Sequence, residues 1–187
     1  PIKGDARYWS VKVGERVAEN VMWNYGDPYE DCVDVREYVA FYWNKVDSWF
    51  EEDTQVFVGP KDPYTRVDCV DSSRNVSISI NGVTVAQTQR PVLMTETGLP
   101  HRYYIPRVDV REDLLVVSER IVGSPYKGEA NYLHVEIDGE RVENVAWSYR
   151  YPTAEAARIA GYICFPQGKV DLYVDGELEP KPRSRWD

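Results

Sequence analysis

The chain has no long hydrophobic run. No stretch approaches the roughly 20 consecutive apolar residues that span a bilayer. The first five residues, Pro-Ile-Lys-Gly-Asp, contain neither the basic segment nor the apolar segment of a signal peptide. We therefore expect no membrane partner.

Cysteine and histidine are scarce, with 3 and 2 residues respectively among 187. Cys32, Cys69 and Cys164 are far apart and share no Cys-x-x-Cys spacing, while His101 and His134 are isolated. This spacing predicts neither a zinc site nor a disulfide framework. Three separated cysteines are typical of reduced thiols that pack as small core residues, so we expect a cytoplasmic protein without a metal or cofactor.

Basic residues are also in the minority, with 22 Lys and Arg against 31 Asp and Glu, which gives a net charge of −9. Such a field repels phosphate backbones, so nucleic acid is not an expected partner. Apolar residues make up 43% of the chain, including 6 Trp and 14 Tyr. This content is sufficient for a buried core and excludes general disorder.

An internal repeat organises the sequence, because an offset of 124 positions aligns the chain with itself. The identities include Pro1 with Pro125, Lys3-Gly4 with Lys127-Gly128, Tyr8 with Tyr132, Trp23 with Trp147, Tyr25 with Tyr149, Phe41 with Phe165, and Lys45-Val46-Asp47 with Lys169-Val170-Asp171. One local slip remains, since Gly-Glu-Arg-Val begins at Gly14 and again at Gly139. We interpret the slip as a one-residue insertion and a matching deletion in a hairpin tip.

The two copies are unequal. Residues 1–60 are predicted to be the second half of a first repeat unit, and residues 61–187 a complete second unit. The incomplete unit would expose a sheet edge that must be paired or covered. Completion by the second copy, by another subunit of a homo-oligomer, or by residues ahead of Pro1 all remain open.

Secondary structure is predicted to consist of strands and tight turns. Val76–Ile80 alternates in polarity, ends at Asn81-Gly82 and continues as Val83–Gln87, which is a strong hairpin signal. Further strands are expected at 8–13, 132–137 and 169–174. Thr153 could cap a helix over 154–160, and a weaker helix is expected over 31–39. The fold class is therefore mainly β, with two related antiparallel units and short helices.

Many scattered motifs of the second copy resemble the family known as domain of unknown function 427. They are Arg90-Pro91-Val92-Leu93, Glu96, Gly98-Leu99-Pro100, Arg102-Tyr103-Tyr104, Pro106, Asp109-Val110, Pro125-Tyr126-Lys127-Gly128, Ala130, Tyr132, Trp147, Tyr149 and Pro152. The resemblance covers about residues 68–179, and its later half recurs in the first copy. It implies a β-tent, two small antiparallel sheets that meet at an angle, in which some relatives hold zinc and others a small ligand in an aromatic cage. The family has also been labelled nucleotidyltransferase-like.

Charged and aromatic residues occupy strand and turn positions where a purely structural sheet would carry aliphatic side chains. They are Arg90, Glu96, Arg102, Tyr103, Tyr104, Lys127, Trp147 and Tyr149. If they converge, they would form a pocket for a small anionic or planar metabolite, because Arg binds carboxylate or phosphate in a bidentate manner and aromatic rings stack. The structural alternative is that Glu96 only forms an ion pair with Arg90 or Arg102 and that Trp147 belongs to the core. The first copy lacks counterparts of Arg90, Glu96 and the Arg-Tyr-Tyr run, so the complete set can form only once.

An enzyme that acts on a nucleotide is the alternative function, and a structural interaction module is the third. A metal-dependent nucleotidyltransferase needs clustered carboxylates, which Asp138-Gly139-Glu140 offers only superficially. The same Asp-Gly-Glu sequence recurs at Asp175, so both are predicted to be hairpin turns. The residue before Pro125 is often Cys in the family that the chain resembles, whereas Ser124 stands here without an evident base.

Overall fold

The computed structural model describes residues 3–51, 54–56, 58–59 and 61–182. Its internal contacts divide the chain into two compact units, residues 1–59 and residues 60–187, which we call the first unit and the second unit.

The first unit is a long hairpin followed by short elements. These are β1 (Arg7–Val13), β2 (Arg16–Asn24), β3 (Ala40–Phe41), the 3-10 helix η1 (Trp43–Lys45), β4 (Trp49–Glu51) and β5 (Thr54–Val56). β1, β2 and β3 form one antiparallel sheet in that order, and β4 pairs with β5 in a separate hairpin.

The second unit contains the remaining strands and three more 3-10 helices. They are β6 (Val67–Asp71), β7 (Val76–Ile80), β8 (Val83–Thr88), β9 (Val92–Glu96), β10 (Arg102–Ile105), η2 (Arg107–Asp109), η3 (Glu112–Leu114), β11 (Leu115–Ser124), β12 (Gly128–Ile137), β13 (Glu140–Pro152), η4 (Ala154–Ile159), β14 (Ile163–Cys164), β15 (Asp171–Val174) and β16 (Glu177–Leu178).

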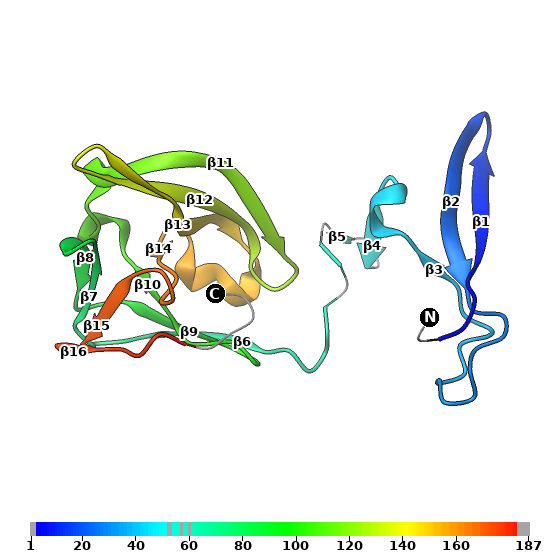
Figure 1. Ribbon diagram of the computed structural model, residues 1–187, viewed down its shortest axis with the longest axis horizontal. Coiled ribbons are helices and arrows are strands. Elements are labelled where there is room, and N and C mark those ends of the chain that lie inside the picture. The colour runs from blue at the N-terminus through cyan, green and yellow to red at the C-terminus, as the bar shows by residue number, and fades with distance from the viewer. Residues whose placement is uncertain (1–2, 52–53, 57, 60, 183–187) are drawn as a thin grey trace. The chain divides into compact units, whose positions relative to one another are not determined.

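Two antiparallel sheets build the second unit, which confirms the predicted mainly β class. The larger has the order β11-β12-β13-β14-β10-β9-β6, and the smaller has the order β16-β15-β7-β8. Figure 1 shows the larger sheet bent strongly, with β11 to β13 on one side, β9 and β6 on the other, and η4 between them. The smaller sheet closes one end of this arrangement.

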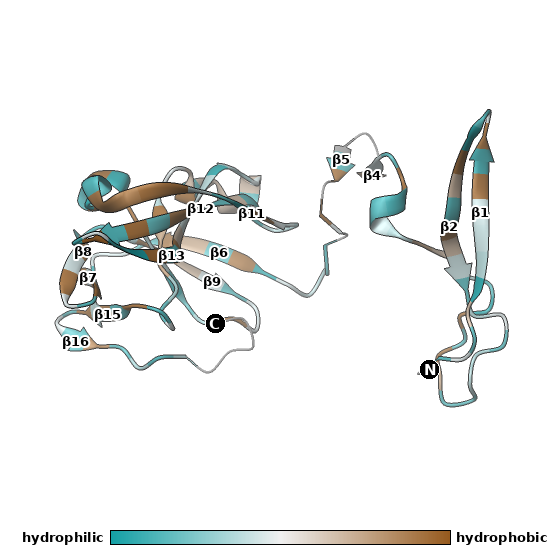
Figure 2. Cartoon of the chain, turned by 45° about the horizontal axis from the view of Figure 1, so that its top comes forward, coloured by the Kyte–Doolittle hydropathy of each residue, from teal (hydrophilic) through white to brown (hydrophobic). Residues whose placement is uncertain are grey.

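Both faces of the larger sheet are apolar over part of their area. Successive residues of a strand point to opposite faces, so Ile105 and Ile163 pack in the cluster shared with the smaller sheet, whereas their neighbours Tyr104 and Cys164 pack in a second cluster with Ile159 of η4. Figure 2 shows hydrophobic segments along β12 and β6 of this unit, and also along β1 and β2 of the first unit. The second cluster, on the face away from the smaller sheet, lies beside the candidate site described below.

The predicted two-residue hairpins are confirmed. Asn81-Gly82, Asp138-Gly139 and Asp175-Gly176 each have positive φ at both positions, from 51° to 89°. This is the pattern of type I′ turns, which match the twist of the flanking strands. The Asp-Gly-Glu sequences are therefore turn residues.

The β1–β2 hairpin differs from the expected insertion and deletion at its tip. Val13 pairs with Arg16 just as Ile137 pairs with Glu140, so the offset of 124 holds through both tips. Only Gly14 has positive φ in the first tip, as in a type II′ turn, whereas the second tip is type I′. Because the two turn types need glycine at different places, the glycine shifts by one position without any change in length.

Helices are shorter than expected. The segment after Thr153 is the 3-10 helix η4 of six residues, and the Thr153 side chain does not cap it but donates from Oγ1 to the carbonyl oxygen of Tyr126 over 2.5 Å. The helix predicted over 31–39 is wrong, because these residues form turns and bends before β3. Within the described part of the chain, no helix has the length and apolar character needed to cross a bilayer.

Replacement of Gly128 by alanine tests the close approach between the turn before β12 and the end of β13. Gly128 has φ +92°, and a Cβ there would lie 2.9 Å from the Tyr151 carbonyl oxygen. We expect Gly128→Ala to lower the free energy of unfolding by about 3 kcal/mol, through both strain and overlap. Gly139→Ala is the matched control, since its φ is +81° but no atom lies within 4 Å of the added Cβ. It should cost about 1–2 kcal/mol. Urea denaturation that gives equal losses would contradict the close approach.

Candidate functional site

A cavity of about 270 Å³ opens on the face of the larger sheet that carries the second apolar cluster. Side chains from β9, β10, β11, β12 and β13 line it, together with the turn that joins β11 to β12 and the loop after β14. The bend of the sheet brings these elements together, although their residues are separated by up to 75 positions, from Met94 to Lys169.

Six of the eight residues predicted to form the site line this cavity. They are Glu96, Arg102, Tyr104, Lys127, Trp147 and Tyr149. The structure therefore brings together most of the predicted set, including residues of both polar and aromatic type.

Arg90 and Tyr103 do not line the cavity. The Arg90 Nε lies 3.3 Å from Asp109 Oδ2, and the Arg90 side chain is 69% exposed. A hydrogen bond of 2.7 Å donated by Thr88, reinforced by Arg90, lowers the pKa of the Asp109 carboxyl. Tyr103 lies between Arg102 and Tyr104 in β10, so its side chain points to the opposite face of the sheet. There it packs against the apolar cluster shared with the smaller sheet.

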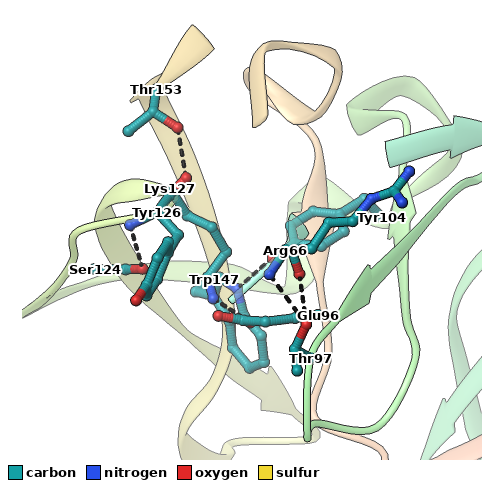
Figure 3. A network of polar contacts seen from close by, with 9 residues as sticks. All are labelled: Arg66, Glu96, Thr97, Tyr104, Ser124, Tyr126, Lys127, Trp147 and Thr153. Atoms are coloured by element: carbon teal, nitrogen blue, oxygen red, sulfur yellow. Dashed lines mark hydrogen bonds and ion pairs between the residues drawn. The ribbon is translucent and has the colours of Figure 1, made fainter. Parts of the chain in front are cut away.

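An ion pair between Lys127 and Glu96 crosses the cavity wall. Figure 3 shows the Lys127 side chain extending from its turn to the Glu96 carboxylate at the end of β9, and the side chains are only 12% and 8% exposed. Glu96 thus pairs with Lys127 and not with Arg90, which was one of the expected alternatives. A pair this well buried is worth little net stability as a whole, but either charge alone would be costly.

The turn that carries Lys127 is held by several hydrogen bonds. The Tyr126 amide donates to Ser124 Oγ over 3.3 Å, and the Tyr126 hydroxyl accepts from the Asp62 amide over 2.6 Å. The Tyr126 carbonyl accepts from Thr153, as noted above, and the Lys127 carbonyl accepts from the Thr153 amide over 3.2 Å. The ammonium group of Lys127 is therefore presented by a fixed piece of backbone.

Aromatic rings form much of the remaining wall. The Trp147 Nε1 donates to the Tyr104 hydroxyl over 3.2 Å, and the Tyr132 and Trp147 ring centroids are 5.7 Å apart. Tyr104 and Tyr149 lie 6.4 Å apart at the back of the cavity. Trp147 thus packs against other aromatic rings and also lines the cavity. The interpretation of Trp147 as a site residue and its interpretation as a core residue therefore do not exclude each other.

Two guanidinium groups lie over these rings. The Arg102 Cζ is 5.8 Å from the Trp147 ring centroid, and the Arg120 Cζ is 4.6 Å from that of Tyr132. Such cation–π contacts orient the flat guanidinium group, and the exposed group of Arg120 can present its edge to an anion.

The sequence prediction missed Arg120, Asn144 and Lys169 as lining residues. Arg120 lies in a β-bulge of β11, where the pairing with β12 shifts between Val117 and Ile121. No pattern in the sequence predicts this bulge. Lys169 did carry a usable signal, because it repeats Lys45 in the first copy.

Comparison of the whole sequence with models of known protein families identifies the family of this chain. A family model described as Domain of unknown function (DUF427) matches residues 1–52 and 68–176. The chain belongs to this family. The match confirms the resemblance based on the scattered motifs, and a comparison with curated proteins gives no match.

Burial keeps two phenols that line the cavity, and a thiol packed in the same apolar cluster, in their neutral form. Burial raises the pKa of Tyr104 and Tyr149 well above the usual phenol value, and burial raises the pKa of the Cys164 thiol to about 12. The Ser124 hydroxyl accepts from a backbone amide, and in the described residues no base hydrogen-bonds to it. None of these groups is thus an activated nucleophile at neutral pH.

No group of three or more His, Cys, Asp or Glu side chains with the geometry of a metal site occurs among the described residues. Of the two histidines, His134 accepts at Nδ1 from the Asn144 amide over 3.1 Å. Glu96 is the one carboxylate that lines the cavity, and it already faces Lys127. The lining residues therefore offer cations, rings and amides to a ligand.

A double-mutant cycle on the buried ion pair tests its energetics. Glu96→Gln and Lys127→Met should each lower the free energy of unfolding by about 3 kcal/mol, because each leaves a buried charge without its partner. The double variant should lose at least ~1 kcal/mol less than the sum of the singles. The control is the Arg111–Asp113 pair, with side chains 56% and 59% exposed, for which we expect a coupling below about 1 kcal/mol. Equal coupling in the two cycles, measured by urea denaturation, would contradict the buried pair.

The raised pKa of Cys164 predicts a loss of stability in alkali. The folded pKa of about 12 exceeds the ~8.5 of an unfolded thiol, so the contribution is complete below pH ~8.5 and declines as the pH rises toward 12. Cys164→Ala should remove a slope of up to about 1.4 kcal/mol per pH unit between pH 8.5 and 10. Cys69→Ala is the comparison, since burial also raises the pKa of this thiol but Cys69 is only partly buried, so a smaller slope should be lost. The expectation fails if urea denaturation gives Cys164→Ala and the unsubstituted protein the same pH slope.

Proposed function

We propose that the second unit binds a small anionic ligand with a planar part in this cavity. The observation that carries the proposal is the charge of the lining. Arg102, Arg120, Lys127 and Lys169 are cationic, whereas Glu96 is the one anionic lining residue. This excess of positive charge lies in a chain whose net charge is −9. A local field opposite to that of the whole molecule favours an anion at this place.

Aromatic side chains support the planar part of the proposal. Tyr132 and Trp147 present tilted rings to the cavity beside the two guanidinium groups. A flat ligand could stack on a ring or a guanidinium plane while its carboxylate or phosphate binds an Arg edge. The volume of about 270 Å³ lies just below the roughly 300–1,000 Å³ of small-molecule sites, which favours a compact metabolite.

An enzyme acting on a nucleotide, as the nucleotidyltransferase-like label implies, is less well supported. Binding of Mg²⁺ against a triphosphate needs several carboxylates, and the lining supplies Glu96 alone. A structural interaction module is the third candidate. A cytoplasmic location remains a proposal from the sequence, for which a homo-oligomer was also one of three ways to complete the first unit. Turnover of a nucleoside triphosphate by the purified protein would favour the enzyme.

A thermal-shift screen against small carboxylates and phosphate esters, with and without an aromatic ring, tests the proposal. A ligand at 100 times its dissociation constant should stabilise the protein by about 2.7 kcal/mol. Arg120→Ala should weaken binding about 10–100-fold, since a charge-assisted hydrogen bond contributes roughly 1.5–3 kcal/mol. Arg120 is exposed, so its removal should leave the melting temperature without ligand nearly unchanged.

Arg141→Ala is the matched control, because Arg141 lies on the same sheet but pairs with Glu136 outside the cavity lining. It should bind like the unsubstituted protein. If no member of the screen stabilises the protein, or if Arg120→Ala responds as fully as Arg141→Ala, the cavity is not an anion site.

A further inference from the structure

The hairpin of the first unit repeats the β12–β13 hairpin of the second unit pair by pair. Tyr8 faces Trp23 as Tyr132 faces Trp147, and both hairpins have a register shift two residues further along the strand. β3 pairs with β2 in the same way as β14 pairs with β13. Trp23 lies opposite Ala40, and Trp147 lies opposite Cys164, which is the same pair at an offset of 124.

The turn before each hairpin is also the same. A Cβ at Gly4 would lie 2.7 Å from the Asp27 carbonyl oxygen, much as one at Gly128 would approach Tyr151. The Tyr29 amide donates to the Lys3 carbonyl over 3.2 Å, which repeats the bond from Thr153 to Lys127. The first unit therefore has the local structure of a half domain.

Burial differs sharply between equivalent positions. Val11 is 37% exposed and Phe41 is 39% exposed, whereas their counterparts Val135 and Phe165 are 0% and 5% exposed. These two residues line a groove of about 290 Å³ in the first unit, together with Val13, Val17, Val21 and Val46. In the second unit, the counterparts of Val11 and Phe41 pack in the cluster shared with the smaller sheet. The groove is thus a core face that nothing within the described first unit covers.

Three strand edges of the first unit are unpaired where the second unit pairs them. In the described sheets, β1 and β3 each have only β2 as a neighbour, and β4 has only β5. The equivalent strands of the second unit are β12, β14 and β15, which have β11, β10 and β7 respectively on their other side. Free edges of this kind pair readily with a further strand.

A single continuous segment fills all three places in the second unit. Residues 67–124 supply β7 to β15, β10 to β14 and β11 to β12, and their apolar side chains cover the core face. We propose that the groove and free edges of the first unit bind a second β segment of this kind, joined in the same polypeptide directly ahead of Pro1. The join follows from the β11–β12 turn, in which Pro125 to Lys127 correspond to Pro1 to Lys3.

A second copy of the chain is a poorer occupant. Its own residues 67–124 already cover the core of its second unit. An exchange of this segment between two chains would therefore uncover as much apolar surface in the donor as it covers in the acceptor. No net apolar burial would drive such an exchange.

A chimera tests the proposal. A duplicate of residues 67–124 is placed directly before Pro1, so that Ser124 of the duplicate precedes Pro1 as it precedes Pro125 in the sequence. The matched control carries Ile78→Asp and Val85→Asp in the duplicate only, because both side chains are buried against the core face in the second unit. Amide hydrogen exchange of β1 and β2 and the molar mass by light scattering are measured for both chimeras and for the 187-residue chain.

We expect all three proteins to be monomers, with amides of β1 and β2 exchanging at least about tenfold more slowly in the chimera than in the other two. Equal exchange in the chimera and its control would overturn the proposal. So would a dimer of the 187-residue chain whose β1 is as protected as β12, which would make a second copy the occupant.

A second measurement does not depend on folding of the chimera. Val11→Asp in the 187-residue chain should leave the thermal unfolding profile and molar mass unchanged, whereas Val135→Asp should abolish the cooperative unfolding of the second unit. A loss of stability in Val11→Asp as large as that in Val135→Asp would show that the face is already covered, and the proposal would fall.

Discussion

The buried ion pair between Lys127 and Glu96 joins the turn at one side of the bent sheet to the end of β9 at the other. Two opposite charges largely removed from water must stay together, because neither can be solvated alone. The pair therefore sets the distance between these two elements and so the width of the cavity. The contacts of Tyr126 and Thr153 then fix the turn from outside, so the charge, the backbone and the aromatic wall form one connected structure.

Most of the fold could be predicted from local sequence. Asn81-Gly82 between alternating strands and the Asp-Gly turns specified hairpins by their need for positive φ, and the structure has them where expected. The segment 31–39 could not be predicted, because its helical pattern is weak and the chain runs there as turns. The insertion and deletion predicted at the tip of the first hairpin were wrong. Gly14 stands one position earlier than Gly139 because the turn type differs, and the two tips have the same length.

The candidate site was partly predictable from the alternation of residues along its strands. Period-two alternation separates Arg102 and Tyr104 from Tyr103, and a strict application of it would have removed Tyr103 from the set. Arg120 lies beyond such reasoning because a bulge in β11 directs it to the cavity. Arg90 was included for its charge, but its guanidinium group pairs with Asp109 of η2 outside the cavity.

If the second unit binds an anion as proposed, the Lys127–Gly128 turn limits where its ligand preference can change. Gly128 allows the close approach of the turn to β13, and Lys127 both lines the cavity and forms the buried ion pair. Most replacements in this turn would therefore destabilise the fold as well as change the cavity. Arg120 and Lys169 lie at the exposed rim and carry no comparable structural duty. Changes in the proposed ligand preference should therefore arise at the rim and not in the turn.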